Sequence, residues 1–446
     1  MKNAVQLGVL VGQKNYHALR EILVEMNPVD IAQFIGELPE EQAVVTFRTL
    51  PKMQAMEVFA ELDAESQQQI VEAINDRELQ ALMDELAVDD AVDMLEEMPA
   101  TLVKRILRQS SHQTRALLNQ FLRYAEHTAG SIMTAEYTNL RRQMTVEDAI
   151  KRIRRIGEDR ETIYTCYVTD STRVLQGVVS VKDLLMAHDT ELIEDIMEPD
   201  VIAVHTAEDQ EKAVDLMAKY DLIALPVVDG ENRLVGIVTV DDAVDVIQEE
   251  ATEDFEKMAG IAPSEKPYLK TGVFSLAKNR FLWLLILMVS GMITGAILGH
   301  YEAAFSAIPL LVSFIPMLTD AGGNAGSQSS TLVIRGMALG EIEMKDFFAV
   351  LWKEARVSVL VGVPLAVVNF ARIVISYPGS TLVAGTVSLT LVFTVVFANA
   401  VGGILPMVAK VFKIDPALMA APLISSLVDA CSLVIYFTIA MVLLPI

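Results

Sequence analysis

The last thirty residues, ALMAAPLISSLVDACSLVIYFTIAMVLLPI (417–446), contain one charged side chain, Asp429. A run of this length can cross the ~30 Å hydrocarbon core of a bilayer as a helix. Asp429 lies 13 residues after Pro416, roughly 20 Å along a helix that rises 1.5 Å per residue. A carboxylate past mid-membrane costs on the order of 3 kcal/mol. We therefore expect Asp429 to face a water-filled path for cations.

Four more apolar runs precede this one, and together the five predict five membrane-spanning helices. They cover Phe281 to Gly299, Ala303 to Ile334, about Phe347 to Ile375, and Leu382 to Ala409. The second run has one charge, Asp320, followed by AGGNAG (321–326). This segment is too rich in glycine for a regular helix, so we expect it to line a cavity. Its carbonyls and the Asn324 amide suit a hard, hydrated cation such as Mg²⁺.

Basic residues in the short loops set the expected orientation, because Lys and Arg are retained on the cytoplasmic side. The relevant bases are Lys270, Lys278, Arg280, Arg335, Lys345, Lys410 and Lys413. With five spans, all of these bases fall on the side of the N-terminal part. The sequence thus predicts a multi-pass protein of the cell membrane with a cytoplasmic N-terminus and an external C-terminus.

Charge is distributed very unevenly along the 446 residues. Residues 1–260 contain 24 Lys+Arg and 50 Asp+Glu, net −26, whereas residues 261–446 contain 11 and 9, net +2. An acidic soluble part lacks the basic face that nucleic-acid binding requires. Two cysteines imply no disulfide framework. The composition therefore excludes a single soluble domain and indicates a membrane protein with a large acidic soluble part.

A repeat of twelve residues runs through the first part of the chain. Its landmarks are Leu38-Pro39, Leu50-Pro51, Leu62-Asp63, Ile74-Asn75, Leu86-Ala87 and Met98-Pro99. Each unit places a helix-starting residue before apolar residues at helical spacing. Units this short cannot bury a face alone, so they should stack as a superhelix of short helices.

A second repeat follows, with two copies of a β-α-β-β-α pattern that resembles a pair of CBS domains. Ile132-Met133-Thr134 and Ile196-Met197-Glu198 open the copies, and GVVSVKD (177–183) and GIVTVDD (236–242) close them. CBS pairs often bind adenosine nucleotides. The positions that would meet a ribose are Ser180, Asp183, Thr239 and Asp242. The same residue types also cap helices, and both interpretations stay open here.

Residues 241–262 begin as one amphipathic helix that leads to the first span. An apolar stripe steps by three and four residues from Val240. The other faces carry eight acids and one base, Lys257. Because so many acids repel one another, we expect this helix to respond to cations.

No feature of the sequence supports catalysis. There is no Walker-type phosphate loop, and the six histidines are scattered without the Cys/His spacing of a zinc site. Nor does any nucleophile have a base placed near it in the sequence. The sequence predicts that the protein is not an enzyme.

The whole chain resembles the MgtE-type magnesium channels. The most specific stretches are YAEHTAGSIMT (124–134), Pro316 through GGNAGSQ (322–328) to Gly336, and Leu405-Pro406 through Asp415-Pro416 to Asp429. The resemblance implies a homodimer whose pore follows the dimer axis. It places Asp429, together with Gly323 and Asn324 of the second span, at a hydrated Mg²⁺ in the pore. Asp320 is added to the predicted pore residues because it is the one charge in that span, not because of the resemblance.

The resemblance also implies closure by intracellular Mg²⁺ bound between the soluble domains and the connecting helix. The implied regulatory residues are Asp89, Asp93, Asp229, Asp245, Glu249, Glu250, Glu253, Asp254 and Asp415. ATP on the CBS pair is a possible modulator. Alternatives are a general transporter of divalent cations such as Mg²⁺ and Co²⁺, a sodium-coupled Mg²⁺ exchanger, and a sensor whose spans only anchor it.

The predicted architecture is therefore a multidomain membrane protein. Its parts are an all-α superhelical N domain (1–130), an α/β tandem CBS pair (131–240), an acidic connecting or plug helix (241–262), and a transmembrane domain of five helices (270–446). The predicted partners are a second copy, Mg²⁺ ions and the lipid bilayer.

Overall fold

Two compact units, Met1–Ile247 and Gln248–Ile446, make up the computed structural model of the chain. The structure describes residues 2–264, 268–269, 271–419 and 421–445. The loop base Lys270 and two residues of the predicted fifth span, Ala420 and Ile446, lie outside the described residues. The boundary between the units falls within α15 (Val240–Met258), the predicted connecting helix.

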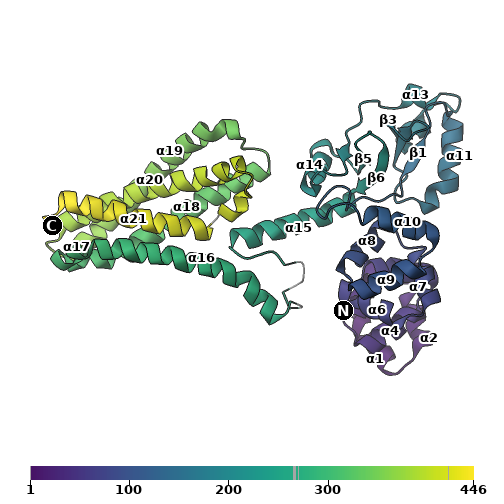
Figure 1. Cartoon of the computed structure of the whole chain (residues 1–446), viewed down its shortest axis with the longest axis horizontal. Coiled ribbons are helices and arrows are strands. Elements are labelled where there is room, and N and C mark those ends of the chain that lie inside the picture. The colour runs from purple at the N-terminus through teal and green to yellow at the C-terminus, as the bar shows by residue number, and fades with distance from the viewer. Residues whose placement is uncertain (1, 265–267, 270, 420, 446) are drawn as a thin grey trace. The chain divides into compact units, whose positions relative to one another are not determined.

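Short helices fill the first part of the N-terminal unit (Figure 1). They are α1 (Lys2–Gly12), α2 (Tyr16–Leu23), α3 (Pro28–Gly36), α4 (Glu40–Thr49), α5 (Lys52–Ala60), α6 (Ala64–Ala73), α7 (Asp76–Met83), α8 (Val88–Glu97), α9 (Ala100–Gln109) and α10 (His112–Phe121). From α3 onward each helix starts twelve residues after the last, which confirms the predicted repeat.

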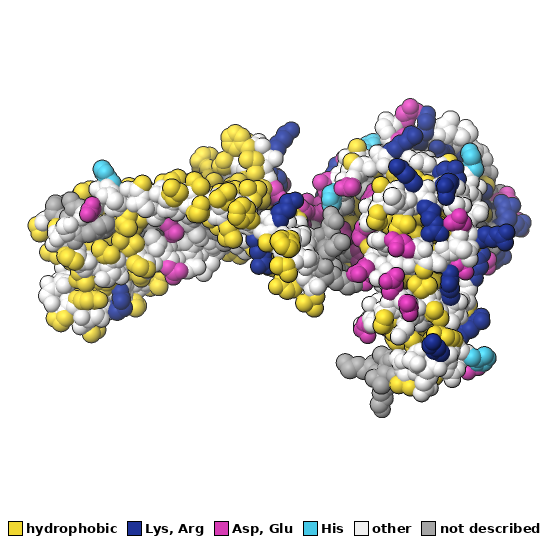
Figure 2. Space-filling view, turned by 60° about the horizontal axis from the view of Figure 1, so that its bottom comes forward, with side chains coloured by type: hydrophobic (Ala, Val, Ile, Leu, Met, Phe, Trp, Pro, Cys, Tyr) yellow, Lys and Arg dark blue, Asp and Glu magenta, His cyan; other side chains and the backbone are white. Residues whose placement is uncertain are grey.

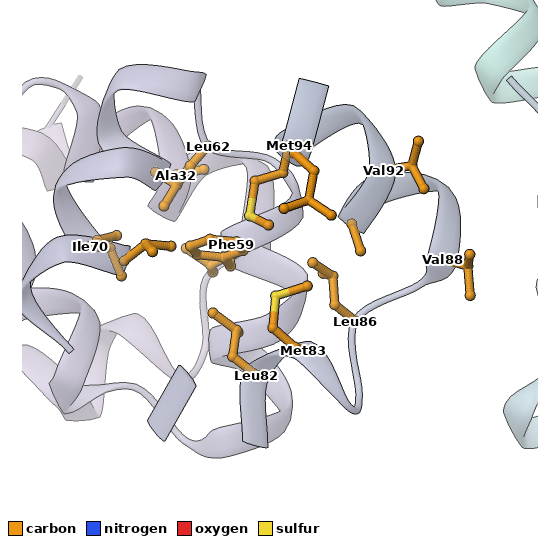
Figure 3. Packing of buried hydrophobic residues seen from close by; sticks show 14 of the residues in the cluster. Ala32, Phe59, Leu62, Ile70, Leu82, Met83, Leu86, Val88, Val92 and Met94 are labelled. Atoms are coloured by element: carbon orange, nitrogen blue, oxygen red, sulfur yellow. The ribbon is translucent and has the colours of Figure 1, made fainter. Parts of the chain in front are cut away.

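Most of the helices in the repeat begin at a residue that caps or starts a helix. Side chains of Asn27, Asp63, Asn75 and Ser111 accept hydrogen bonds from the first turns of α3, α6, α7 and α10. Proline occupies the corresponding position before α4, α5 and α9. Each helix buries one apolar edge against its neighbours, and Figure 3 shows Phe59, Ile70 and Met83 meeting in the shared interior.

The CBS pair forms two three-stranded sheets in the same unit. The first copy contains β1 (Thr138–Leu140), α11 (Val146–Ile156), β2 (Thr165–Thr169), β3 (Leu175–Ser180) and α12 (Val181–Met186). After α13 (Ile193–Ile196), the second contains β4 (Val204–His205), α14 (Gln210–Tyr220), β5 (Ala224–Val228), β6 (Leu234–Thr239) and α15. The orders β1-β2-β3 and β4-β5-β6 confirm the predicted repeat.

The opening segment of each copy crosses the closing strand of the other. A side chain at Gly177 would lie 2.7 Å from Met197, and one at Gly236 would lie 2.6 Å from the carbonyl oxygen of Thr134. Bridges join Thr134 with Ile237 and Val178 with Glu198. The glycines of the two closing motifs therefore allow the two copies to pack as one pair.

Long apolar helices form the second unit. They are α16 (Val273–His300), α18 (Ile315–Ala338), α19 (Phe347–Ser376), α20 (Thr381–Val411) and α21 (Ala421–Leu443), with the short α17 (Glu302–Ala307) before α18. Among the described residues, four segments are long and apolar enough to cross a membrane, Val273–His300, Met344–Ser376, Thr381–Val411 and Pro416–Leu443. The remaining predicted span, the second in chain order, contains α18, which is more polar and packs against α20 and α21.

Two expectations for the second run were wrong. The run from 303 to 334 is not one continuous helix, because α17 ends at Ala307 and a 3₁₀ segment, Pro309–Phe314, separates it from α18. The glycine-rich segment 321–326 is helical throughout. Tertiary packing outweighs the low helix propensity of glycine here.

The glycines of α18 and α20 allow their backbones to approach closely. A side chain at Gly402 would lie 2.2 Å from the carbonyl oxygen of Gly326, and one at Gly322 would lie 2.7 Å from Thr394. A side chain at Gly326 would meet Ile424 of α21 at 2.7 Å. Small residues at such positions are a common basis for helix association in membranes.

Replacing Gly402 with alanine should destabilise the membrane domain, because the new methyl group has no space beside α18. Overpacking of this kind costs about 1–3 kcal/mol. The midpoint of thermal unfolding in detergent should fall for Gly402→Ala. Gly385→Ala, in the same helix, is the matched control, because a side chain there meets nothing within 4 Å. Equal midpoints for the two variants would contradict the packing account.

Candidate functional site

Two neighbouring helices of the membrane domain bring the predicted pore residues together. Asp320 and Asn324 lie one turn apart on α18, and the Asn324 amide donates a hydrogen bond of 3.1 Å to the Asp320 carboxylate. Asp429 of α21 lies close enough to Asp320 for their charges to repel. The structure thus juxtaposes two carboxylates and an amide on adjacent helices.

Gly323 sets the separation of α18 from α21 near these acids. A side chain at Gly323 would lie 3.2 Å from the hydroxyl oxygen of Ser425, one turn before Asp429. Gly323 therefore contributes close packing beside the acids. Its carbonyl also accepts a hydrogen bond of 2.8 Å from Ser327, within the helical segment.

Among the residues that the structure describes, no basic side chain neutralises the charge of this pair. Residues 281–334 and 414–446 contain no Lys or Arg, and no ion pair among the described residues includes Asp320 or Asp429. Asp320 and Asn324 are exposed, and Asp429 is half-buried. Figure 2 shows isolated acidic side chains among hydrophobic ones on the surface of the helical part. Oxygen ligands with uncompensated negative charge suit a hydrated divalent cation.

A second acidic cluster, which we call the sensor cluster, lies in the N-terminal unit. It consists of Asp89, Asp90 and Asp93 of α8 with Glu161, Asp241 and Asp242 of the CBS pair. Burial and then the Glu161 charge raise the pKa of Asp89 to about 6, although hydrogen bonds oppose this shift. Burial, followed by repulsion from Asp89, Asp93, Asp242 and Glu161, raises the pKa of Asp90 to about 7.

Asp242 belongs to this cluster by its electrostatic contacts. Burial is the largest cause that raises its pKa to about 6, and Asp89 and Asp241 add to it. The Thr239 hydroxyl donates a hydrogen bond of 2.6 Å to the Asp242 carboxylate. One carboxylate oxygen of Asp89 is buried without a hydrogen-bond partner. Folding therefore holds like charges together at a cost in free energy that a cation would reduce.

The sensor cluster is not a preformed coordination cage. Among the described residues, no three His, Cys, Asp or Glu side chains converge closely enough to hold a metal ion. Asp93 and Asp241 are exposed, whereas Asp89, Asp90 and Asp242 are half-buried. The arrangement suits an ion that keeps most of its water, as Mg²⁺ commonly does.

The other predicted regulatory residues lie in two different settings. Asp229 closes the turn between β5 and β6, where its carboxylate accepts from the amides of Glu231 and Arg233 at 2.9 Å. Asp245 is exposed on α15. Further along α15 are Glu249, Glu250, Glu253 and Asp254. The structure brings Asp89 and Asp90 together with Asp93 and Asp242, and their like charges repel one another.

The end of α15 is tied to the membrane domain by a three-residue ion-pair network. The Lys257 ammonium lies 2.7 Å from the Asp415 carboxylate and 2.6 Å from that of Glu253. Burial disfavours the charged Lys257, but the hydrogen bonds to Asp415 and Glu253 outweigh it and raise the Lys257 pKa. Burial and the Asp415 charge raise the pKa of Asp254. Asp415 immediately precedes the segment that leads into α21, which carries Asp429.

The chain then reverses against the first long helix. Gly260 has a φ of +70°, and a side chain there would lie 2.0 Å from the Trp283 ring of α16. The Ala262 amide donates to the Asn279 carbonyl oxygen at 3.1 Å. The end of α15 therefore contacts both the start of α16 and the loop before α21.

The predicted nucleotide residues act as helix caps in the structure. Ser180 and Asp183 form a reciprocal capping box at the start of α12, and Ser180 accepts from the Asp183 amide at 3.1 Å. Thr239 bonds to Asp242 across the start of α15. These contacts give each residue a structural role, and nucleotide binding by them stays a prediction.

Sequence reasoning missed Asp90, Glu161 and the pairing of Lys257 with the predicted residue Asp415. Asp90 lies next to the predicted Asp89, and an acidic pair at the first turn of a helix normally stabilises the helix dipole. Glu161 is over sixty residues from α8, so no local pattern links them. Lys257 was visible as the only base on the acidic helix, but its pairing with Asp415 requires the fold.

Comparisons with known proteins agree with this geometry. Residues 315–439 match the family model for the divalent cation transporter MgtE, residues 26–127 match the MgtE intracellular N domain, and residues 129–189 and 193–249 match the CBS domain. A helical membrane domain with uncompensated acids, joined to these soluble domains, defines a transporter of divalent cations. It is not an enzyme.

Relatives that match this chain over almost their whole length identify its family among the transporters of divalent cations. The chain is 38% identical to the magnesium transporter MgtE of Thermus thermophilus over 99% of both chains, and 31% identical to that of Bacillus subtilis over 97% of this chain and 95% of the relative. The chain belongs to the MgtE family of magnesium transporters, which are multi-pass membrane proteins.

A solved structure also matches the soluble part. It is the cytosolic domain of the Mg²⁺ channel MgtE in complex with ATP, at 40% identity and a TM-score of 0.52, covering 55% of this chain and 99% of the solved one. A second, the soluble part of a magnesium transporter, has 29% identity and a TM-score of 0.53, and covers 56% of this chain and 98% of the solved one.

The raised pKa values of the sensor cluster predict how its stability depends on pH. A carboxyl group whose pKa is higher in the fold than in the unfolded chain takes up protons on folding, so stability should rise as pH falls. For Asp90 the gain in stability begins as the pH falls to about 7, the pKa of Asp90 in the fold. It is complete below 3.8, the ordinary pKa of an aspartate. In EDTA, hydrogen exchange of α8 should slow between pH 8 and pH 5.5 after correction for the intrinsic rate.

Asp90→Asn should slow exchange at pH 8 and flatten the pH profile. Asp84→Asn is the control, because hydrogen bonds from Thr114 and Ser111 outweigh burial and lower the pKa of Asp84. Removal of the Asp84 charge should therefore not stabilise α8 at pH 8. An Asp90→Asn protein less protected than wild type at pH 8 would contradict the repulsion described for this cluster.

Proposed function

We propose that the protein is a Mg²⁺-selective channel that mediates magnesium influx across the cytoplasmic membrane and is closed by intracellular Mg²⁺. The observation that carries the proposal is the pair of unneutralised carboxylates, Asp320 and Asp429, on adjacent apolar helices. Such groups in a membrane require water and a counter-ion. The family transports magnesium, and this pair is the best-suited site in the membrane domain for the ion.

The pore is formed by two copies of the chain in this proposal. Asp320 and Asn324 are exposed on a single copy, and exposure of Asp320 to lipid would be costly. A second copy facing α18 and α21 would double the number of acids and enclose a hydrated ion between them. The exposed side chains Val244 and Ile247 on α15 give the soluble part an apolar face for the same partner.

The proposed orientation places the N-terminal unit in the cytoplasm. Arg280 lies at the start of α16, Arg335 near the end of α18, Lys345 before α19, and Lys410 and Lys413 after α20. The antiparallel order of the helices puts these bases at one membrane surface, which the positive-inside rule assigns to the cytoplasm.

Influx through such a channel needs no separate energy source. A divalent ion that moves inward down about 100 mV releases roughly twice 2.3 kcal/mol. A gated channel is therefore sufficient. Mg²⁺ influx into proteoliposomes without sodium on either side tests the channel against a sodium-coupled exchanger, because only the exchanger would be inactive there.

Closure depends on the acids of the soluble part. At low intracellular Mg²⁺, repulsion within the sensor cluster and along α15 loosens their packing. At high Mg²⁺, ions neutralise these acids and stabilise the arrangement in which α15 holds Asp415 through Lys257. Because Asp415 precedes α21, the position of α15 then controls the helix that carries Asp429. ATP at Ser180, Asp183, Thr239 and Asp242 would act as a modulator, as suggested by the ATP-bound relative.

Removing the Asp429 carboxylate should abolish transport. Asp429→Ala in proteoliposomes should lower Mg²⁺ influx at least tenfold, because the pore loses the charge that offsets dehydration of the ion. Glu341→Gln, in the exposed connection after α18, removes a carboxylate elsewhere and should retain influx. Wild-type influx by Asp429→Ala would show that the spans do not carry the ion through this site.

Neutralising the acids of α15 should impair feedback. A protein in which Asp245, Glu249, Glu250, Glu253 and Asp254 are replaced by their amides should remain conductive when internal Mg²⁺ is high. Influx is measured into proteoliposomes loaded with increasing Mg²⁺. Amide replacement of Glu37, Glu40, Glu41, Glu57 and Glu61 in the N domain is the charge-matched control. Feedback of wild-type strength in the α15 variant would show that these acids are not the switch.

A further inference from the structure

A polar cavity lies in the first CBS copy, away from the acids described above. Its volume is about 480 Å³, and its lining includes Arg141, Arg142, Gln143, Ser171 and Gln176. Ligand pockets in proteins commonly have volumes of about 300–1,000 Å³. The lining includes two guanidinium groups, two amides, the hydroxyl groups of Thr169 and Ser171 and the carboxylate of Asp170, and no aromatic side chain.

The sheet topology explains why these donors meet. β1 runs parallel to β2, and both end at the edge where the antiparallel β3 begins. Arg141 follows the last residue of β1, Thr169 ends β2, and Gln176 is the second residue of β3. Ser180 lies at the far end of β3, opposite Thr165. The cavity is therefore at the other end of this sheet from Ser180, the predicted nucleotide residue that ends β3.

The two arginines retain donors that the fold does not use. Arg141 directs one nitrogen to the Thr169 carbonyl oxygen at 3.0 Å. Arg142 pairs with Glu194 at 3.4 Å, but its Nε is buried without a hydrogen-bond partner. A guanidinium has five N–H donors and no acceptor, so most of these donors remain for a ligand that offers several oxygens.

The one acid in the lining is occupied by its own turn. Asp170 accepts hydrogen bonds from the Thr172 amide at 2.8 Å and from the Val174 amide at 3.0 Å. These contacts fix the turn between β2 and β3. The carboxylate therefore has a structural role at the cavity edge.

The stretch of sequence that supplies most of the cavity lining is basic, although the domain as a whole is acidic. Residues 141–173 contain eight Lys+Arg and six Asp+Glu, net +2, against −26 for residues 1–260. Arg152 lies within electrostatic range of both Arg141 and Arg160. Burial first, and then Arg155, Arg141 and Arg160, lower the pKa of Arg152. Figure 2 shows Lys and Arg side chains gathered on the N-terminal unit.

We propose that this cavity binds a small, hydrophilic phosphoryl polyanion through Arg141, Arg142 and Gln176. Paired guanidinium groups match the oxygens of a phosphoryl group with two parallel hydrogen bonds each. The size of the cavity accommodates more than one phosphoryl group. The lack of an aromatic lining favours a polyphosphate or a sugar phosphate over a nucleobase.

The test is calorimetric titration of the full chain in detergent with inorganic tripolyphosphate, in EDTA so that Mg²⁺ does not complex the ligand. The wild type should show saturable binding that weakens with salt. Arg141→Gln and Arg142→Gln should each weaken it roughly tenfold or more, the loss expected for hydrogen bonds to a charged group. Arg142→Lys keeps the charge but lacks the planar guanidinium group. Its affinity for tripolyphosphate should lie between those of the wild type and Arg142→Gln.

Two further variants distinguish this cavity from general charge and from misfolding. Arg154→Gln/Arg155→Gln removes two exposed bases of α11 outside the lining and should bind as the wild type does. Gln176→Glu keeps the shape, leaves the Arg142–Glu194 pair intact and should repel the ligand. Absence of tripolyphosphate binding by the wild type, or equal losses in the α11 variant, would overturn the proposal.

A parallel titration with ATP separates the two sources of phosphoryl groups. If the cavity recognises phosphoryl groups alone, Arg141→Gln should weaken the binding of tripolyphosphate much more than that of ATP. Asp183→Asn should leave the binding of tripolyphosphate unchanged. If Asp183→Asn weakens both ligands equally, the phosphate would be held at the opposite end of the sheet, and the proposed site would be wrong.

Discussion

Close contact between α18 and its two neighbours is the constraint on which the membrane domain depends. Gly402 of α20 lies against the backbone of Gly326, and Gly323 lies against Ser425 of α21. Side chains larger than hydrogen at these glycines would separate the helices. With the helices this close, Asp320 and Asp429 are held within range of each other's charge, so the packing geometry also creates the electrostatic property of the site.

The same constraint explains why an apparently poor helical sequence is helical. The segment 321–326 has three glycines, each of which costs about 1 kcal/mol relative to alanine in an isolated helix. In the fold, this cost is offset by the close contact of the glycines with α20 and α21. Within a bilayer, backbone hydrogen bonds must also be satisfied internally. Close packing and the absence of water both favour the helix.

Much of the fold could be predicted because its patterns are local. The twelve-residue repeat, the paired β-α-β-β-α units and the acidic α15 each appear as residues at fixed spacing. The site was less accessible. Asp429 could be identified because an unpaired charge in an apolar run is costly, whereas the grouping of Asp90 with Glu161, and of Lys257 with Asp415, joins residues far apart in sequence. The break before α18 was also hidden, because Pro309 and its apolar neighbours continue the hydropathy of the run.

Repulsion between acids has different consequences in the membrane domain and in the sensor cluster. In the membrane domain the two carboxylates lie on adjacent apolar helices, and a hydrated cation that enters would be attracted by both. In the sensor cluster the acids lie where protons compete, since the pKa of Asp90 is raised to about 7. A cation there must displace a fractional proton, so its apparent affinity should increase with pH. Because α15 contains Asp242 at its start and Lys257 near its end, one continuous helix links the charge state of the cluster to the contact with Asp415. In the proposed mechanism protons and Mg²⁺ both relieve this repulsion, so acidification and Mg²⁺ should favour the same packed state.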